Sequence, residues 1–198
     1  MGPAKPVVAD TRWMVAEVFR LRVSLRGAEP EIWRQVEVVS TSTLFQLHGV
    51  LQRAMGWTDS HLHQFWQGDR CFGPPDPEFG TPREDERLVR LNTVLSTPTD
   101  ELMYEYDFGD GWEHDVVLEA VGPVTGDEPR VSDGRGACPP EDVGGIPGFE
   151  LFLEVLSDPR HPQHGEMLEW HGPFDPEAFD IAATNRALRG RRRKRTDA

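Results

Sequence analysis

The chain has 198 residues, of which 37% are hydrophobic, so it can bury a core without support from disulfides or metals. No stretch approaches the roughly 20 apolar residues of a membrane-spanning helix, and the start, MGPAKPVVADTRW, lacks the pattern of a secretory signal. Two cysteines do not make a disulfide framework. We therefore expect a cytoplasmic protein that makes no contact with membranes.

The charge is unevenly distributed along this acidic chain. The last ten residues, RGRRRKRTDA, contain six of the 21 basic residues and one of the 34 acidic ones. This leaves 15 basic and 33 acidic residues, a net charge of −18, in the rest of the chain. An acidic body repels nucleic acid, so we expect any contact with phosphate only through Arg191, Arg192, Arg193, Lys194 and Arg195. The alternative, which we favour, is a solvated, disordered tail.

The first predicted elements are a pair of strands. From Glu17 the sequence VFRLRVSL alternates apolar and polar side chains, which is typical of a half-buried strand. Turn residues at 27–30 separate it from IWRQVEVV (32–39), which predicts a second strand. These two segments predict a β-hairpin.

A helix and two more strands are expected next. Thr43 and Gln46 have the spacing of a capping box, and the apolar stripe that follows ends before Gly56. His48 lies near this stripe, and we expect a hydrogen-bonded core histidine there. HLHQFWQ (61–67) predicts a third strand that turns into a short fourth. The strand–strand–helix–strand order predicts an α+β fold with a β-grasp-like mixed sheet.

The second half predicts a further hairpin, which extends the sheet, and then helices. LVRLNTVL (88–95) fits a strand or a short helix. Apolar residues around Phe149 fit one helical face, and a last helix is expected to begin with Asp175 as its N-cap and to end near Gly190. We see no internal boundary, so we expect one domain at residues 17–189, with disordered ends at 1–16 and 190–198.

The second hairpin is ELMYEYDFGDGWEHDVVLEAV (101–121), and its register is open. A two-residue turn at Asp110 and Gly111 would place Asp107 opposite His114, but would mix apolar and charged side chains on each face. A three-residue loop keeps one face apolar, so we favour it. It pairs Phe108 with Trp112, Tyr104 with Val116 and Leu102 with Leu118.

The favoured register places like charges opposite one another on the polar face. Asp107 faces Glu113 and Glu105 faces Asp115, which is unfavourable by up to about 1 kcal/mol for each pair. The compensating charge comes from a ladder of Arg20, Arg22 and Arg26, from a bound cation, or from a basic partner; we favour the arginines. For a partner, the candidate binding residues are Glu105, Glu113, Asp115 and Trp112.

A metal centre of another kind is the main catalytic hypothesis. His61 and His63 lie two residues apart in a predicted strand, so their rings should point to the same side. Nitrogen and carboxylate ligands suit Zn²⁺, although no established metal-binding signature is present. The candidate ligands are His61, His63, Asp107, Asp110 and His114, to which Cys138 and Asp142 are possible additions.

Other catalytic motifs are absent or isolated. The sequence has no P-loop, no G-x-G-x-x-G and no G-x-S-x-G, and the D-F-G at 107–109 lacks the other kinase motifs. Cys138 in ACPPEDVGG fits a nucleophile or a structural cysteine, and we favour the structural role.

Three long segments together resemble a known family. They are QLHGVLQRAMGWTDSHLHQF (46–65), YEYDFGDGWEHDVVLE (104–119) and ACPPEDVGGIPGFELFLEVLSDPRHPQHGEMLEW (137–170). The chain resembles the plasmid pRiA4b ORF-3-like family over residues 17–189. This resemblance implies an α+β domain and an association with plasmids and mobile elements. It implies no established reaction, cofactor or catalytic residue.

Three functional hypotheses follow from the sequence. The first is a non-catalytic binding or accessory module with a protein partner. The second is a metal-dependent hydrolase that uses the His/Asp residues with a divalent ion. The third is weak, salt-dependent nucleic-acid contact through the basic tail.

Overall fold

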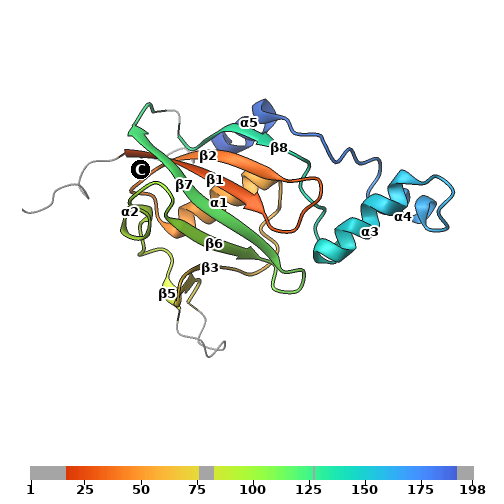
Figure 1. Cartoon of the computed structure of the whole chain (residues 1–198), viewed down its shortest axis with the longest axis horizontal. Coiled ribbons are helices and arrows are strands. Elements are labelled where there is room, and N and C mark those ends of the chain that lie inside the picture. Colours follow the sequence, from red (N-terminus) through yellow and green to blue (C-terminus); the bar gives the residue numbers. More distant parts are fainter. Residues whose placement is uncertain (1–16, 76–82, 127, 191–198) are drawn as a thin grey trace, which may run out of the picture.

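The computed structural model describes residues 17–75, 83–126 and 128–190, which form an eight-stranded mixed sheet with five helices (Figure 1). The strand order across the sheet is β5-β4-β3-β6-β7-β1-β2-β8. The strands are β1 (Glu17–Leu25), β2 (Trp33–Val39), β3 (His63–Gln67), β4 (Arg70–Gly73), β5 (Glu84–Asp85), β6 (Glu101–Tyr106), β7 (Trp112–Pro123) and β8 (Arg130–Arg135). The helices are α1 (Leu44–Met55), α2 (Leu91–Val94), α3 (Gly145–Ser157), α4 (His164–Trp170) and α5 (Ile181–Arg189).

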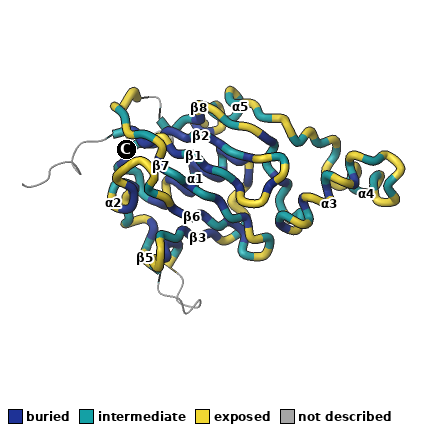
Figure 2. The backbone as a smooth tube through the Cα atoms, viewed as in Figure 1, coloured by how far each residue is buried: buried dark blue, intermediate teal, exposed yellow. Residues whose placement is uncertain are grey.

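The core lies between one face of the sheet and α1. The apolar residues of β1, from Phe19 to Leu25, alternate with the arginines and are buried, as the sequence pattern predicts. Leu47 and Leu51 of α1 are buried in the same cluster. In Figure 2 the centre of the sheet is mainly buried, whereas the surroundings of α4 are mainly exposed.

The predictions for the N-terminal half are confirmed in their main features. β1 and β2 pair antiparallel as the expected hairpin. Thr43 caps α1 in a complete capping box with Gln46, and Gly56 ends the helix in the left-handed conformation. The ambiguous segment at 88–95 contains the short helix α2.

The fold is a mixed α+β fold in which the β6–β7 hairpin occupies the middle of the sheet. β7 pairs with β6 on one side and with β1 on the other, both antiparallel, and so joins β1–β2 to β3–β4. The single parallel contact among the described strands is between β4 and β5. The β-grasp label stays a prediction, since this strand order does not establish it.

The favoured register of the β6–β7 hairpin is wrong by two residues. Tyr106, and not Phe108, pairs with Trp112, and Tyr104 pairs with His114. The apolar face is preserved, because a shift by two residues keeps every side chain on its side. The loop therefore contains five residues, 107–111, and Asp107 leaves the ladder in a left-handed conformation with φ of 56°.

The C-terminal helices differ from the expectation in one boundary. The apolar face of α3 is buried through Phe149 and Phe152. The last helix begins at Ile181 with Asp180 as its N-cap, whereas Asp175 forms a separate turn in which its side chain accepts a hydrogen bond from the Glu177 amide. α5 packs against α1 and β8, whereas α3 and α4 project from one end of the sheet (Figure 1).

Several predictions concern residues outside the described part of the chain. These are the disordered ends at 1–16 and 191–198 and the basic tail; Gly190 itself is the C-cap of α5. The assignment of residues 17–189 to one domain stays a prediction. Among the described residues, the helices are too short or too polar to cross a bilayer.

Candidate metal centre

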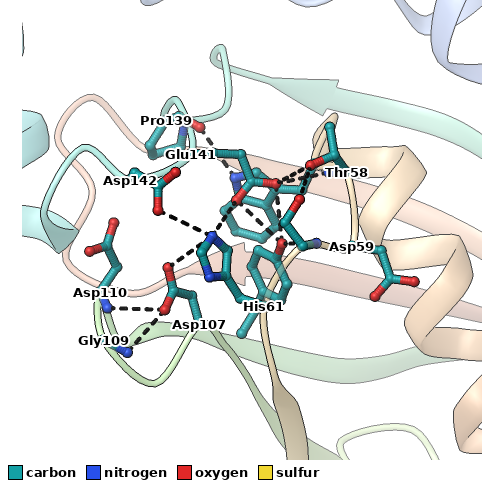
Figure 3. A network of polar contacts seen from close by, with 12 residues as sticks. Thr58, Asp59, His61, Asp107, Gly109, Asp110, Pro139, Glu141 and Asp142 are labelled. Carbon is teal, nitrogen blue, oxygen red and sulfur yellow. Dashed lines mark hydrogen bonds and ion pairs between the residues drawn. The ribbon is translucent and has the colours of Figure 1, made fainter.

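Three loops bring a histidine and three carboxylates together at one end of the sheet. His61 lies just before β3, and Asp107 is the first residue after β6. Glu141 and Asp142 lie in the segment between β8 and α3. Figure 3 shows the three carboxylates converging on the ring of His61.

The centre of this group is the Nε2 atom of His61. It lies 3.2 Å from Oδ1 of Asp142, 3.6 Å from Oδ2 of Asp107 and 3.7 Å from Oε2 of Glu141. The atom is shielded from solvent and makes no hydrogen bond within the described parts of the chain. A buried polar atom without a partner is costly, so this arrangement needs an additional group or a proton to be stable.

The separations are those expected between ligands of one metal ion. Nitrogen and oxygen ligands lie about 2.0–2.2 Å from Zn²⁺, so adjacent ligands of the same ion are roughly 2.8–3.6 Å apart in octahedral or tetrahedral geometry. One ligand atom each from His61, Asp107 and Asp142 lies within 4.8 Å of the other two. These three residues are therefore close enough to be candidate ligands of one ion.

The backbone of the β6–β7 loop fixes the carboxylate of Asp107. Its Oδ1 accepts a hydrogen bond of 3.0 Å from the Gly109 amide, and its own amide donates to the carbonyl of Leu62 at 2.8 Å. The side chain is only 10% exposed. Because Oδ1 is used within the loop, Oδ2 is the atom that faces His61.

Glu141 is positioned by residues on the opposite side. Its Oε1 accepts hydrogen bonds from the amide and hydroxyl of Thr58, at 2.8 and 3.1 Å, and from the phenol of Tyr106 at 3.1 Å. Burial and the neighbouring Glu141 raise the pKa of Tyr106, so the phenol remains a donor at neutral pH. Oε2 also accepts a longer hydrogen bond of 3.3 Å from the same phenol, and it faces the centre.

Asp142 forms the open side of the centre. Its side chain is 73% exposed, and its φ of 59° is in the left-handed region. The loop that carries it is attached to the β6–β7 loop, because Oδ2 of Asp110 accepts a hydrogen bond of 3.0 Å from the Gly144 amide. The side of the group at Asp142 is therefore open to solvent.

The structure brings together part of the predicted ligand set. His61 and Asp107 are in the centre, and Asp110 supports it through Gly144. His63 and His114 lie apart from this centre. The ring of His63 bonds Glu86 at 2.8 Å and stacks on His48, with 3.4 Å between the ring centroids and 4° between the planes.

The stacked pair of His48 and His63, together with Asp59, is a less suitable metal site, although its atoms are close enough. Ring nitrogens offer their lone pairs in the ring plane, and two parallel planes 3.4 Å apart do not converge on one ion. Nε2 of each ring also bonds a carboxylate at 2.8 Å, Asp59 for His48 and Glu86 for His63. This pair is a hydrogen-bonded core network, as predicted for His48.

His114 is a core residue. It is fully buried opposite Tyr104, and its Nδ1 donates to the main-chain carbonyl of Tyr104 at 3.2 Å. Burial lowers the pKa of His114 to about 4, so the ring is neutral at physiological pH. The alternation that places it on the apolar face was visible in the sequence.

The candidate partner surface also needs correction. Trp112 is fully buried in the core and is not available to a partner. Glu113 and Asp115 both accept hydrogen bonds from Arg26, at 2.9 and 2.6 Å, which confirms the arginine as their countercharge. The other two members of the expected ladder have different partners: Arg20 pairs with Glu37 and Arg22 with Glu31.

Glu141 was missed by the sequence reasoning, and Asp142 was included only as an addition. The signal was present in the segment CPPEDVGG, in which two adjacent carboxylates follow a rigid Pro-Pro pair and precede two glycines. Cys138 in the same segment does not join the centre. Burial raises the pKa of its thiol, which favours the structural reading.

The chain is similar to a known protein family, to a bacterial relative and to a solved structure. A model of the plasmid pRiA4b ORF-3-like protein family matches residues 17–183. The chain belongs to this family. It is 48% identical over 174 residues to the uncharacterised protein y4hQ of Sinorhizobium fredii, covering 87% of this chain and 88% of that protein. The crystal structure of a protein of unknown function from Methanosarcina mazei Go1 is similar, with a TM-score of 0.78 and 34% identity, over 84% of this chain and 97% of the other.

Proposed function

We propose that this family member is a binding module that depends on a divalent cation, held by His61, Asp107 and Asp142, with Glu141 beside it. The observation that carries the proposal is the enclosed Nε2 of His61, which faces three carboxylates at 3.2–3.7 Å. Three carboxylates gathered around one atom repel one another, and a cation offsets that repulsion. The association with plasmids and mobile elements is proposed from the family description.

The ligand types favour a transition metal. Ca²⁺ and Mg²⁺ prefer sites composed of oxygen atoms alone. An imidazole nitrogen together with carboxylates suits Zn²⁺ or Mn²⁺. We also propose a cytoplasmic location, in keeping with two cysteines that are both free thiols.

The cation would connect segments that are distant in the sequence. It would join the loop before β3, the β6–β7 loop and the segment before α3, which now meet through hydrogen bonds such as that of Asp110 to Gly144. A partner that touches this end of the sheet would then encounter one fixed surface instead of three separate loops. Such metal-dependent ordering is the mechanism we assign to the binding module.

A metal-dependent hydrolase is the second candidate, favoured by the position of Glu141. Its Oε2 faces the centre, and the residue also lines a neighbouring cavity. A carboxylate beside a metal-bound water can act as a general base, and the exposed side at Asp142 leaves a coordination position open. Nucleic-acid contact through residues 191–195 stays a third prediction, outside the described residues.

Metal titration of variants tests the proposed function. We expect one Zn²⁺ or Mn²⁺ ion per chain by calorimetry and elemental analysis, and an affinity at least about tenfold lower in Asp142→Asn and His61→Ala. Asp69→Asn, at an exposed turn residue, is the matched control and should bind as the unchanged protein does. Unchanged binding in both site variants would rule out this centre.

The variant Glu141→Gln distinguishes a hydrolase from a non-catalytic binding module. If the protein is a hydrolase, turnover of p-nitrophenyl phosphate or acetate should be lost in this variant while one ion remains bound. Metal binding without turnover of either probe supports the non-catalytic module.

A further inference from the structure

A cavity of about 640 Å³ lies beside the candidate metal centre. Its walls are the C-terminal end of α1, the segment 137–141, His171 and the residues at the start of α5. This volume is within the range of cavities that bind small molecules. Glu141 is the residue that the cavity and the metal centre share.

The wall contains a buried guanidinium group, that of Arg34. Arg34 is only 1% exposed and its donors reach four main-chain carbonyls, those of Trp33, Ala54, Arg135 and Gly136, at 2.7–2.9 Å. The plane of the group lies on the ring of Phe179, with 3.8 Å from Cζ to the ring centroid. The side chain therefore has a fixed position.

The positive charge of Arg34 has no anionic partner among the described residues. Its hydrogen bonds there are all to neutral carbonyls, and none of the ion pairs formed by those residues includes it. Burial lowers the pKa of Arg34 to about 10, so the group still carries its charge at neutral pH. A buried cation without a countercharge is unfavourable, and a bound anion removes that cost.

One donor of the guanidinium is still available. The group has five N–H bonds, and the contacts with protein carbonyls use four of them: one from Nε, two from Nη1 and one from Nη2. The second N–H of Nη2 is the one that no carbonyl of the described residues uses. A carboxylate or phosphate oxygen makes the strongest hydrogen bond of this kind.

The two carboxylates that line the same cavity have partners of their own. Oε1 of Glu141 accepts from Thr58 and Tyr106. Oδ1 of Asp180 accepts from the Ala183 amide as the N-cap of α5. Neither of them is an ion-pair partner of Arg34, so the end of the cavity at Arg34 is the end that favours an anion.

The remaining walls are largely apolar. Trp57, Met55 and Phe179 line the cavity together with Pro139 and Pro140. Trp57 is held in place by a hydrogen bond of 3.2 Å from its Nε1 to the carbonyl of Pro139. The charged side chains in this wall are Arg34, Arg53, Glu141 and Asp180. Aromatic and aliphatic surface next to a buried guanidinium favours a ligand with one anionic head and an apolar body.

We propose that this cavity binds a small organic anion, a carboxylate or a phosphate ester, whose head bonds Arg34 and whose apolar body packs against Trp57 and Phe179. The proposal does not depend on a metal ion, because none of the three proposed ligands contributes to this wall. The shared Glu141 places the far end of such a ligand toward the metal centre.

Calorimetric titration of metal-free protein with four probes tests the proposal. Benzoate and phenyl phosphate carry both features, inorganic phosphate has the charge alone, and benzamide has the apolar body alone. We expect binding of benzoate or phenyl phosphate at least about tenfold tighter than that of benzamide and inorganic phosphate. The stronger of the two aromatic anions identifies the head group as a carboxylate or a phosphate.

A matched pair of variants on α5 tests the location. Ala183→Trp fills the cavity from a position that lines it, whereas Ala182→Trp adds the same side chain at an exposed position outside it. Aromatic-anion binding should be lost in Ala183→Trp and kept in Ala182→Trp. Asp69→Asn, at an exposed turn residue outside both sites, should bind the aromatic anions as the unchanged protein does.

Three results would overturn the proposal. They are equal binding of benzamide and benzoate, full binding by Ala183→Trp when its circular dichroism is native, and absence of binding by all four probes. Each of these results would leave the metal titration unaffected.

Discussion

At the scale of single residues, the buried histidine of β7 makes the stability of the fold depend on pH. His114 is fully buried, and burial lowers its pKa to about 4 from the ordinary value of 6.5. The unfolded chain therefore takes up a proton on this residue before the folded protein does. The stabilisation is complete above pH 6.5 and is lost as the pH falls from 6.5 through 4.

We predict that the free energy of unfolding decreases by about 3 kcal/mol between pH 7 and pH 4 through His114 alone. His114→Asn keeps a donor for the Tyr104 carbonyl and removes this titration, so its stability should depend less steeply on pH. Denaturant unfolding at a series of pH values measures the slope. His48, whose pKa is also lowered by burial, accounts for part of the remaining slope.

His164→Asn is the control for this pH experiment. Its ring also donates to a main-chain carbonyl, that of Val155 at 2.9 Å, but the residue is partly exposed. The slope should be unchanged in His164→Asn. An equal slope in His114→Asn and the unchanged protein would contradict the assignment of the buried neutral ring.

Arg26 is the countercharge of the polar sheet face. It bonds Glu113 and Asp115 but is about half exposed, so its contribution is screened by solvent. We predict that Arg26→Gln lowers the free energy of unfolding by about 0.5–1 kcal/mol at low salt and by much less in 1 M salt. Arg160→Gln, at an arginine that is 93% exposed, should have no measurable effect. A loss that does not depend on salt would exclude this ion-pair explanation.

At the scale of elements, the β6–β7 hairpin shows what the sequence could and could not specify. Alternation identified the buried face correctly, because each position on that face is apolar or His114. The predicted register is wrong because Phe108, an aromatic residue at the end of the alternating run, fits a strand. The left-handed conformation of Asp107, which starts the loop two residues earlier, has no clear signal in a non-glycine residue.

The contact between two loops is the element-scale feature on which the metal centre depends. Gly145 has a φ of 68°, and a Cβ atom on it would collide with the carbonyl oxygen of Asp110. We predict that Gly145→Ala separates the segment of Asp142 from the β6–β7 loop and weakens metal binding by at least about tenfold. Titration with Zn²⁺ measures this effect.

Gly165→Ala is the matched control, because the space around Gly165 is open. It lies in α4, where alanine is favourable for the helix by about 0.5–1 kcal/mol. Metal affinity should be unchanged in this variant. Equal metal affinity in Gly145→Ala and Gly165→Ala would show that the loop contact does not position the ligands.

At the scale of the whole molecule, the candidate centre is assembled from segments 80 residues apart in sequence. His61 and Asp107 were identified because histidines and carboxylates are the usual ligands. Their convergence with Glu141 and Asp142 depends on how the β8–α3 segment returns to the end of the sheet, which no local pattern specifies. For the same reason His63 was assigned to the centre, although its neighbour in the fold is His48.

A ligand that binds only the folded protein raises its stability, so metal should affect the whole molecule. We predict that Zn²⁺ at 100 times its dissociation constant raises the free energy of unfolding by about 2.7 kcal/mol. Thermal unfolding with and without the ion measures the change, and Asp142→Asn should abolish most of it. An equal increase in this variant would place the ion elsewhere.

The most direct measurement is anomalous X-ray diffraction at the zinc absorption edge, from a crystal of the protein grown with Zn²⁺. A single strong peak is expected within about 2.0–2.2 Å of Nε2 of His61 and of carboxylate oxygens of Asp107 and Asp142. Density that shows a hydrogen-bonded His61 ring with no anomalous peak beside it, in the presence of saturating zinc, would contradict the metal centre.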